Sequence, residues 1–249
     1  MSKIALVTGA SSGIGKACAL ALLQEGWTVI LVGRRADALA QAIAQGGKSQ
    51  ANAFAHPTDL SDEVQVKALF AQVRSRYGRL DLLFNNAGIS LPHTLPGDLS
   101  GDEWRRAVDI NLNGAFYALS HAFKLMQEQS PQGGRIINNG SISAHMPRPG
   151  SVAYTATKHA ITGLTKAASL DGRAFNIAVG QIDIGNVASD MTLKMAKGVH
   201  QPDGSIRPEP RMDMSAVVET FLTMVRLPLS ANILFTTVMA TNMPFVGRG

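Results

Sequence analysis

The stretch Ile4-Ala5-Leu6-Val7-Thr8-Gly9-Ala10-Ser11-Ser12-Gly13-Ile14-Gly15 decides the fold. Its first four residues are apolar, which predicts a buried strand, and helical spacing begins at Ile14. Glycines between a strand and a helix allow a sharp turn and bring an anion close to the free N–H groups of a helix N-terminus. The spacing differs from the common Gly-x-Gly-x-x-Gly. The position nevertheless predicts a dinucleotide-binding turn, with a purely structural turn as the alternative.

The same alternation of short apolar runs and helical patterns continues along the chain. Seven strands are predicted, at Ile4–Val7, Val29–Val32, Ala51–Ala55, Leu80–Phe84, Arg135–Asn138, Phe175–Val179 and Ile233–Val238. Six helices are predicted between and after them, at Ile14–Glu25, Asp37–Gln45, Asp62–Arg76, Asp102–Gln129, Val152–Asp171 and Met214–Val225. Strands that alternate with helices favour a parallel sheet covered on both faces. The sequence therefore predicts an α/β, Rossmann-type, doubly wound fold with a seven-stranded parallel sheet.

We expect all 249 residues to form a single nucleotide-binding domain, since α/β units of this length are common. Two segments depart from the alternation. Residues Gly185–Asp213 are long and rich in glycine and proline, which predicts a partly helical lid over the substrate. The tail Met243–Gly249 is expected to be frayed or docked on another subunit.

Composition limits the classes of partner. The formal net charge is +5, but the basic residues are scattered, with no run longer than two and no interleaved aromatic residues, so no nucleic-acid partner is expected. The apolar runs are too short to cross a bilayer, and no signal peptide is evident, which favours a cytoplasmic protein. The single cysteine, Cys18, lies among small apolar residues and is interpreted as an inert buried thiol.

The end of the second predicted strand reads Leu31-Val32-Gly33-Arg34-Arg35. A site specific for NAD usually places a carboxylate here against the ribose hydroxyl, and none is present. Two guanidinium groups can instead make forked, charge-assisted hydrogen bonds to a 2′-phosphate. We therefore expect NADP(H), with NAD(H) less favoured. The alternative is that Arg34 and Arg35 are a solvated helix entry in which Asp37 caps the helix.

Tyr154 and Lys158 carry the predicted chemistry. Residues four apart share one face of a helix, so both side chains can reach one site from the start of the Val152–Asp171 helix. A free phenol is a weak base at neutrality because it ionises near pH ~10. A nearby ammonium and an oxidised nicotinamide both stabilise a phenolate.

Over nearly its whole length the chain resembles the short-chain dehydrogenase/reductase family, in its single-domain branch of about this length. Four signatures carry the resemblance, in the family's order: Thr8–Gly15, Asn85-Asn86-Ala87-Gly88, Ser141, and Tyr154-x-x-x-Lys158. The resemblance implies that Asn111, Ser141, Tyr154 and Lys158 are catalytic. Ser141, at the family's separation of thirteen residues before Tyr154, would hydrogen-bond the substrate oxygen as charge develops there, and Asn111 would hold a water that links Lys158 to solvent. The resemblance also implies that Asp59 lies beside the adenine, that Asn86–Gly88 supports the adenosine side, and that Lys158 binds the ribose hydroxyls. Together with the turn and the two arginines, the expected cofactor site is formed by Gly9, Ser11, Ser12, Gly13, Ile14, Gly15, Arg34, Arg35, Asp59, Leu60, Asn86, Ala87, Gly88, Tyr154, Lys158, Gly180 and Ile182.

After the sixth strand the family usually has a Pro-Gly pair and a nearby threonine against the nicotinamide. We expect Val179 to replace the proline and Ile184 the threonine, with Gly180 and the backbone of Ile182 still near the nicotinamide. Gln181, Asp183 and Asn186 would add polar contacts that the family pattern does not predict. The six histidines lack metal-ligand spacing, and we expect no metal.

The leading hypothesis is an NADP(H)-dependent oxidoreductase that interconverts a carbonyl compound and a secondary alcohol, similar to 3-oxoacyl reductases or general carbonyl reductases. His93 and His145 are candidate substrate contacts, and Met191, Met195, Met212 and Met214 could adapt the lid to an apolar substrate or simply pack it. The alternatives are a catalytically silent NADP-binding regulator and a sugar epimerase or dehydratase of the family's longer branch. By resemblance, the two longest helices would form the interfaces of a homotetramer, or of a homodimer. Small residues on both helices permit such close contact, at Gly114, Ala115, Ala118, Ala160, Gly163 and Ala167.

Overall fold

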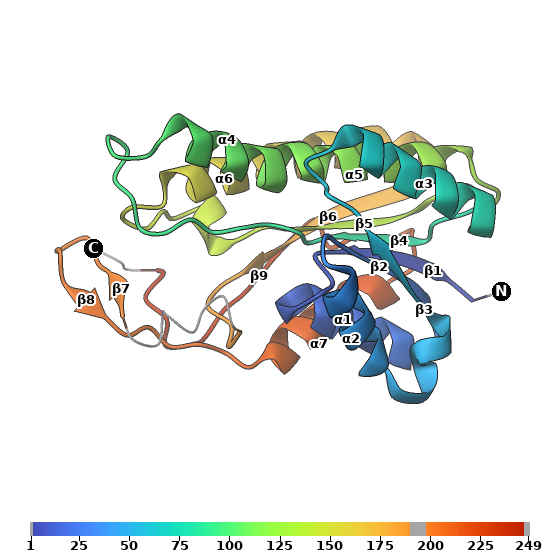
Figure 1. The fold of residues 1–249 in the computed structure, drawn as a ribbon, viewed down its shortest axis with the longest axis horizontal. Helices are drawn as coiled ribbons and strands as arrows, with labels where there is room; N and C mark the ends of the chain where they lie inside the picture. Colours follow the sequence, from blue (N-terminus) through green and yellow to red (C-terminus); the bar gives the residue numbers. More distant parts are fainter. Residues whose placement is uncertain (1, 190–197, 247–249) are drawn as a thin grey trace.

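The computed structural model describes residues 2–189 and 198–246, and its centre is a seven-stranded parallel sheet (Figure 1). The strand order is β3-β2-β1-β4-β5-β6-β9, and every neighbouring pair is parallel. The strands are β1 (Ile4–Thr8), β2 (Thr28–Gly33), β3 (Ala53–Pro57), β4 (Leu82–Asn85), β5 (Gly134–Asn139), β6 (Ile177–Ile184) and β9 (Phe235–Val238). The predicted doubly wound sheet is confirmed.

Helices cover both faces of the sheet. They are α1 (Gly13–Gln24), α2 (Ala36–Ala44), α3 (Glu63–Tyr77), α4 (Gly101–Val108), α5 (Gly114–Glu128), α6 (Val152–Gly172) and α7 (Met214–Arg226), with short 3₁₀ turns at Gly47–Asn52, Ile142–Ala144 and Arg173–Phe175. Figure 1 shows α1, α2 and α7 below the sheet and α3, α4, α5 and α6 above it. Each face has its own apolar core, represented by Phe84 with Phe221 below the sheet and by Leu83 with Phe70 above it. Among the described residues, no helix is both long enough and apolar enough to cross a membrane.

The chain reverses direction across the sheet between β1 and β4. After β1 it continues outward to β2 and β3, and it then returns to place β4 on the other side of β1. The loops after β1 and β4 therefore leave the sheet side by side at its carboxyl edge. In parallel α/β sheets this switch point is where ligands bind.

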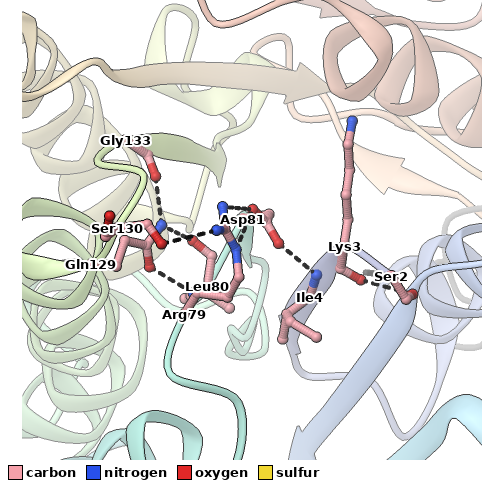
Figure 2. Close-up of polar contacts among 9 residues, drawn as sticks. All are labelled: Ser2, Lys3, Ile4, Arg79, Leu80, Asp81, Gln129, Ser130 and Gly133. Atoms are coloured by element: carbon pink, nitrogen blue, oxygen red, sulfur yellow. Dashed lines mark hydrogen bonds and ion pairs between the residues drawn. The ribbon is translucent and has the colours of Figure 1, made fainter.

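The amino edge of the sheet is held by a compact polar cluster (Figure 2). The Asp81 carboxylate accepts a hydrogen bond from the Ile4 backbone N–H at 2.8 Å and forms an ion pair with Arg79 at 2.6 Å. The buried Gln129 amide spans the Leu80 backbone, with its oxygen 2.8 Å from the Leu80 nitrogen and its nitrogen 3.0 Å from the Leu80 oxygen. These contacts fix the starts of β1 and β4, so the opposite ends of the two strands are set in register for the site.

Two elements differ from the sequence prediction. The predicted Asp102–Gln129 helix is interrupted by a π-helical turn at Asp109–Asn113, which separates α4 from α5. Strand β6 continues to Ile184 rather than ending at Val179, and all eight of its residues are buried. Gln181 and Asp183 can lie inside the sheet because neighbouring polar groups satisfy their side chains.

The predicted lid is described from Gly185 to Ser189 and from Gly198 onward. A small antiparallel hairpin, β7 (Val199–His200) with β8 (Ile206–Arg207), extends from the carboxyl edge of the sheet (Figure 1). Met191 and Met195 lie outside the described residues, while Met212 and Met214 pack against the lower core. Of the tail, Met243 is buried and packs with Ile142 and Ala240. Cys18 is fully buried, and burial raises the pKa of its thiol, as expected for an inert cysteine.

Candidate active site

A pocket of about 900 Å³ opens along the carboxyl edge of the sheet. This volume is near the top of the range for small-molecule sites, roughly 300–1,000 Å³. The predicted site residues that line it are Gly9, Ser11, Ser12, Gly13, Ile14, Arg34, Arg35, Asp59, Leu60, Asn86, Ala87, Gly88, Ser141, Tyr154 and Lys158. The pocket extends from the glycine-rich turn to the start of α6, so it joins the predicted nucleotide turn to the predicted chemical groups.

The glycine-rich turn is built on close backbone approach. Gly9 and Gly13 have φ values of 65° and 54°, a left-handed region that favours glycine. A Cβ at Gly15 would lie 2.4 Å from the Gly9 carbonyl oxygen, and one at Gly9 would lie 2.9 Å from Ala87 Cα. These three glycines therefore let the turn fold onto the start of α1 and onto the loop after β4.

The N-terminus of α1 is open toward the pocket. A Cβ built at Gly13 would meet no described atom within 4 Å, and within the described chain the Ser12 side chain makes no capping hydrogen bond. First-turn N–H groups without intrahelical partners, together with the positive end of the helix dipole, form an anion site. This geometry fits a dinucleotide pyrophosphate.

The segment Asn85–Gly88 is tied to the glycine-rich turn by Thr8. The Thr8 hydroxyl oxygen accepts hydrogen bonds from the backbone N–H groups of Asn86 at 2.8 Å and Ala87 at 3.0 Å. The Asn86 side chain donates to the Thr8 carbonyl at 2.9 Å and accepts from Asn139 at 2.8 Å. The loops after β1, β4 and β5 are thereby joined into one rigid floor.

Basic side chains predominate around the pocket. The described lining contains four basic side chains, Arg34, Arg35, Arg148 and Lys158, and one carboxylate, Asp59, and Arg148 is already paired with Glu209. Arg34 and Arg35 are exposed directly after β2, and no described carboxylate forms an ion pair with either of them. Arg35 is the N-cap residue of α2, and Asp37 lies in the first turn without a capping bond in the described chain. Asp59 is partly engaged, since its Oδ1 accepts from the Ser61 hydroxyl at 2.7 Å.

Tyr154, Lys158 and Ser141 meet at the other end of the pocket. Lys158 is buried on α6, donates to the Asn139 carbonyl at 2.7 Å, and places its Nζ 5.6 Å from the centre of the Tyr154 ring. Ser141 follows β5, and its Oγ accepts from the Ser143 backbone N–H at 3.1 Å. The Ser141 hydroxyl hydrogen is therefore free to point at a ligand. The arrangement combines a hydroxyl donor, a phenol and an ammonium, as acid/base chemistry at an oxygen requires.

Asn111 lies in the π-helical turn, and its side chain contacts Thr157, the neighbour of Lys158 on α6. Its side chain is buried, accepts from the Ile89 N–H at 2.7 Å and donates to the Ile89 carbonyl at 2.9 Å and to Thr157 Oγ1 at 3.3 Å. It is not among the described residues that line the pocket. Its observed contacts hold the loop after β4 against α6.

Gly15, Gly180 and Ile182 also do not belong to the described lining. Gly15 lies beneath the turn. Gly180 and Ile182 are buried inside β6, where they pair with Ile137 and Asn139 of β5. The expectation that these two residues lie near the nicotinamide stays a prediction. Ile184, the last residue of β6, and Gly185, which follows it, are the residues at this end of the strand that line the pocket.

The sequence interpretation missed several lining residues, among them Gly185, Val187, Ser189, Arg148 and His200. A second glycine, Gly185, follows the alternating Ile182 and Ile184, and this pattern could have marked the true end of β6. His200 packs against His93 with ring centres 4.0 Å apart and ring planes tilted by 30°, and both line the pocket. His145 is absent from the described lining and instead contacts Asp183. In the described ranges, no three His, Cys, Asp or Glu side chains gather closely enough to hold a metal ion.

The sequence matches the family model described as short chain dehydrogenase over residues 3–199, well over half of the chain. It is 41% identical over 169 residues to a 3beta-hydroxysteroid dehydrogenase of Mediterraneibacter gnavus, covering 68% of this chain and 60% of that protein. It is 37% identical over 193 residues to a 3-oxoacyl-[acyl-carrier-protein] reductase of Staphylococcus aureus, covering 77% of each. The solved closed form of a serine dehydrogenase complexed with NADP+ superposes with a TM-score of 0.86 at 25% identity, over 99% of this chain and 98% of that one.

Proposed function

Since this chain belongs to the short-chain dehydrogenase family, we propose that it is an NADP(H)-dependent oxidoreductase that interconverts a carbonyl compound and a secondary alcohol. The observation that carries the proposal is the convergence of Ser141, Tyr154 and Lys158 on the pocket that also contains the glycine-rich turn. The two relatives described above are named as a dehydrogenase and a reductase, which supports the same chemistry and gives no support to a silent regulatory protein.

In the proposed reaction, Tyr154 transfers the proton and Ser141 holds the substrate oxygen. A nicotinamide bound between the glycine-rich turn and α6 would supply or accept the hydride at the carbonyl carbon. Ser141 donates its free hydroxyl hydrogen to the oxygen on which charge develops. Tyr154 gives its phenolic proton to that oxygen in reduction and removes it in oxidation, and the adjacent Lys158 ammonium stabilises the phenolate.

Lys158 has a second proposed duty in binding. A buried ammonium has three N–H donors, and the Asn139 carbonyl is the acceptor recorded for it among the described residues. A buried charge needs further partners. Ribose hydroxyl groups of the cofactor would satisfy the remaining donors. Asn111 is proposed to hold a water that links this ammonium to solvent.

The preference for NADP(H) over NAD(H) rests on Arg34 and Arg35. Both are exposed and line the pocket directly after β2, the strand that pairs with β1 beside the glycine-rich turn. A 2′-phosphate there would receive charge-assisted hydrogen bonds, whereas the unphosphorylated cofactor would leave two cations without an anionic partner. A relative of similar fold bound to NADP+ is consistent with this preference.

The assembly is proposed to be a homotetramer formed through α5 and α6. Gly114, Ala115 and Ala118 are buried within the chain, so these small residues serve the internal packing of α5. Gly163 and Ala167 of α6 are exposed, and Phe116 of α5 and Leu170 of α6 expose 48% and 60% of their surface. Large exposed apolar side chains beside small ones favour helix-to-helix contact between subunits.

A screen of carbonyl compounds and alcohols tests the proposed function. Ketones, 3-oxoacyl thioesters and hydroxysteroids would be offered to the purified protein with NADPH or NADH, while nicotinamide absorbance is followed. We expect turnover of at least one compound class and a higher kcat/KM with NADPH. If no compound of any class turned over with either cofactor, the proposal would be wrong.

A further inference from the structure

A buried carboxylate, Asp183, lies beside Ser141 at the carboxyl end of β6. Its side chain is 1% exposed, which is rare for an aspartate and requires a full set of partners. Parallel strands that are buried on both faces are ordinarily apolar throughout. The residue therefore interrupts the expected pattern at the point where the strand reaches the proposed active site.

The partners of Asp183 connect it directly to Ser141. Its Oδ1 accepts a hydrogen bond from the Ser141 backbone N–H at 2.9 Å and from Gln181 Nε2 at 2.8 Å. Its Oδ2 lies 2.9 Å from His145 Nε2. The last backbone hydrogen bond between the β5 and β6 segments runs from the Gly140 nitrogen to the Ile182 carbonyl. The bond from the Ser141 N–H to the Asp183 carboxylate continues this pairing by one residue.

Gly140 provides the space for this carboxylate. A Cβ at position 140 would lie 2.0 Å from Asp183 Oδ1 and 2.6 Å from Gln181 Nε2, which is closer than real Cβ contacts permit. The glycine is therefore required by the Asp183 side chain rather than by its own backbone angles. Gly140 and Asp183 form one structural unit immediately before Ser141.

Gln181 connects the same carboxylate to α6. Its Nε2 also lies 3.1 Å from Thr162 Oγ1, and its Oε1 lies 2.9 Å from Thr165 Oγ1. Both threonines are on α6, the helix that carries Tyr154 and Lys158. A satisfied buried polar network of this kind is rigid and specifies one arrangement. It fixes the position of Ser141 relative to the helix that carries the proposed acid.

We propose that Asp183 is a positioning residue, whose carboxylate holds the Ser141 backbone so that the serine hydroxyl meets the substrate oxygen opposite Tyr154. This inference rests on the proposed function and deepens it. Asp183 is not among the described residues that line the pocket, so it acts through Ser141 and not on the substrate. Loss of its hydrogen bond displaces the hydroxyl, and small displacements of positioning groups lower turnover strongly.

The test compares Asp183→Ala and Asp183→Asn, each with Ser141 intact and with Ser141→Ala. With Ser141 intact, we expect Asp183→Ala to lower kcat by roughly 10- to 100-fold while the Kd for NADPH stays within about twofold. Asp183→Asn should retain most of the activity, because its amide oxygen can accept from Ser141 and Gln181 while its nitrogen donates to His145. In the Ser141→Ala background, adding Asp183→Ala should lower kcat by less than a further factor of about two. The exposed Asp171→Asn on α6 is the matched control.

Three kinetic results would overturn the proposal. The first is an unchanged kcat in Asp183→Ala. The second is that Asp183→Ala lowers kcat by the same factor in the Ser141→Ala background as it does with Ser141 intact. The third is that Asp183→Asn lowers kcat as much as Asp183→Ala does. If Asp183→Ala does not fold, Gly140→Ala serves instead, since the added Cβ displaces the carboxylate from the Ser141 N–H without removing its charge. It should lower kcat with the same unchanged cofactor affinity, and full activity in it would equally overturn the proposal.

A crystal structure of Asp183→Ala, or of Gly140→Ala if the former does not fold, supplies a readout that does not need turnover. We expect the Ser141–Ser143 segment to shift while Tyr154 and Lys158 keep their positions. If Ser141 stays in place, Asp183 does not position it, whatever the kinetics. A wild-type protein that reduces no carbonyl compound would instead refute the proposed function, and the position of Ser141 in the variant would still decide this inference.

Discussion

At the scale of single residues, the proposed site depends on polar atoms whose partners are already fixed. Lys158 is held by the Asn139 carbonyl, Asn86 by Thr8 and Asn139, and Ser141 by Ser143 and Asp183. These bonds leave the Ser141 hydroxyl hydrogen available, and they use one of the three ammonium hydrogens of Lys158. Such a preorganised site needs little rearrangement when charge develops on a substrate oxygen.

The proposed preference for NADP(H) also rests on single residues, Arg34 and Arg35. Replacing both by alanine should raise the Kd for NADPH roughly 10- to 100-fold, because charge-assisted hydrogen bonds to the 2′-phosphate are lost. The Kd for NADH should change little. Fluorescence titration of both cofactors measures this, with Arg105→Ala/Arg106→Ala on α4 as an exposed control pair. Tighter wild-type binding of NADH than of NADPH would contradict the assignment.

At the scale of elements, the central strands were predictable because strands buried on both faces form continuous apolar runs, as in Ile4–Thr8 and Leu82–Asn85. Strand β6 was predicted too short because Gln181 and Asp183 look like the end of a strand in sequence. Their buried partners come from α6 and from the loop after β5, and no local pattern reveals them. Because the strand was predicted to end early, Gly180 was assigned to the pocket, whereas Gly185 is the glycine that lines it.

The neighbourhood of the proposed catalytic pair was predictable because it is local in sequence. Tyr154 and Lys158 are four residues apart on one helix, so their neighbourhood is local. Arg148 and His200 were missed because they reach the pocket from a loop and from a hairpin that are about 50 residues apart in sequence. Contacts of this kind depend on the tertiary path of the chain.

Arg135 anchors the connection between α7 and β9, which flanks β6. The side chain is 3% exposed, and its guanidinium donates to the carbonyls of Leu227, Pro228 and Ala231 at 3.0–3.1 Å. Arg135→Met should lower the free energy of unfolding by roughly 3 kcal/mol, because these partly buried carbonyls lose a charged donor. Urea denaturation measures the change. The exposed Arg173→Met is the control, and an equal effect of the two changes would exclude this anchoring role.

At the scale of the whole molecule, the order of the strands places every part of the site on one edge. The loops after β1, β4, β5 and β6 all leave the carboxyl edge of the sheet, and the polar cluster around Asp81 and Gln129 holds the opposite edge (Figure 2). The β7–β8 hairpin extends on the carboxyl side (Figure 1). The polar cluster therefore holds the amino edge of the sheet, and the proposed chemistry lies at the carboxyl edge. The single-domain organisation of all 249 residues stays a prediction.

The proposed assembly is also a property of the whole molecule. Phe116→Glu on α5 should shift a tetramer to smaller species, because a charge in an apolar interface loses its hydration without gaining a partner. Sedimentation velocity measures the distribution of species. Val64→Glu on α3, at a position 76% exposed, is the control and should leave the assembly intact. An unchanged distribution for Phe116→Glu would show that α5 does not form the interface.

The most direct test of the account is the turnover of Tyr154→Phe, measured with a carbonyl compound that the wild-type protein reduces. The substitution removes the phenolic hydroxyl and keeps the ring, so the Kd for NADPH should stay within about twofold. Loss of the general acid should lower kcat by roughly 10²- to 10⁴-fold. Tyr117→Phe on α5, outside the described lining of the pocket, should reduce the compound at the wild-type rate. Turnover by Tyr154→Phe at the wild-type rate would contradict the mechanism.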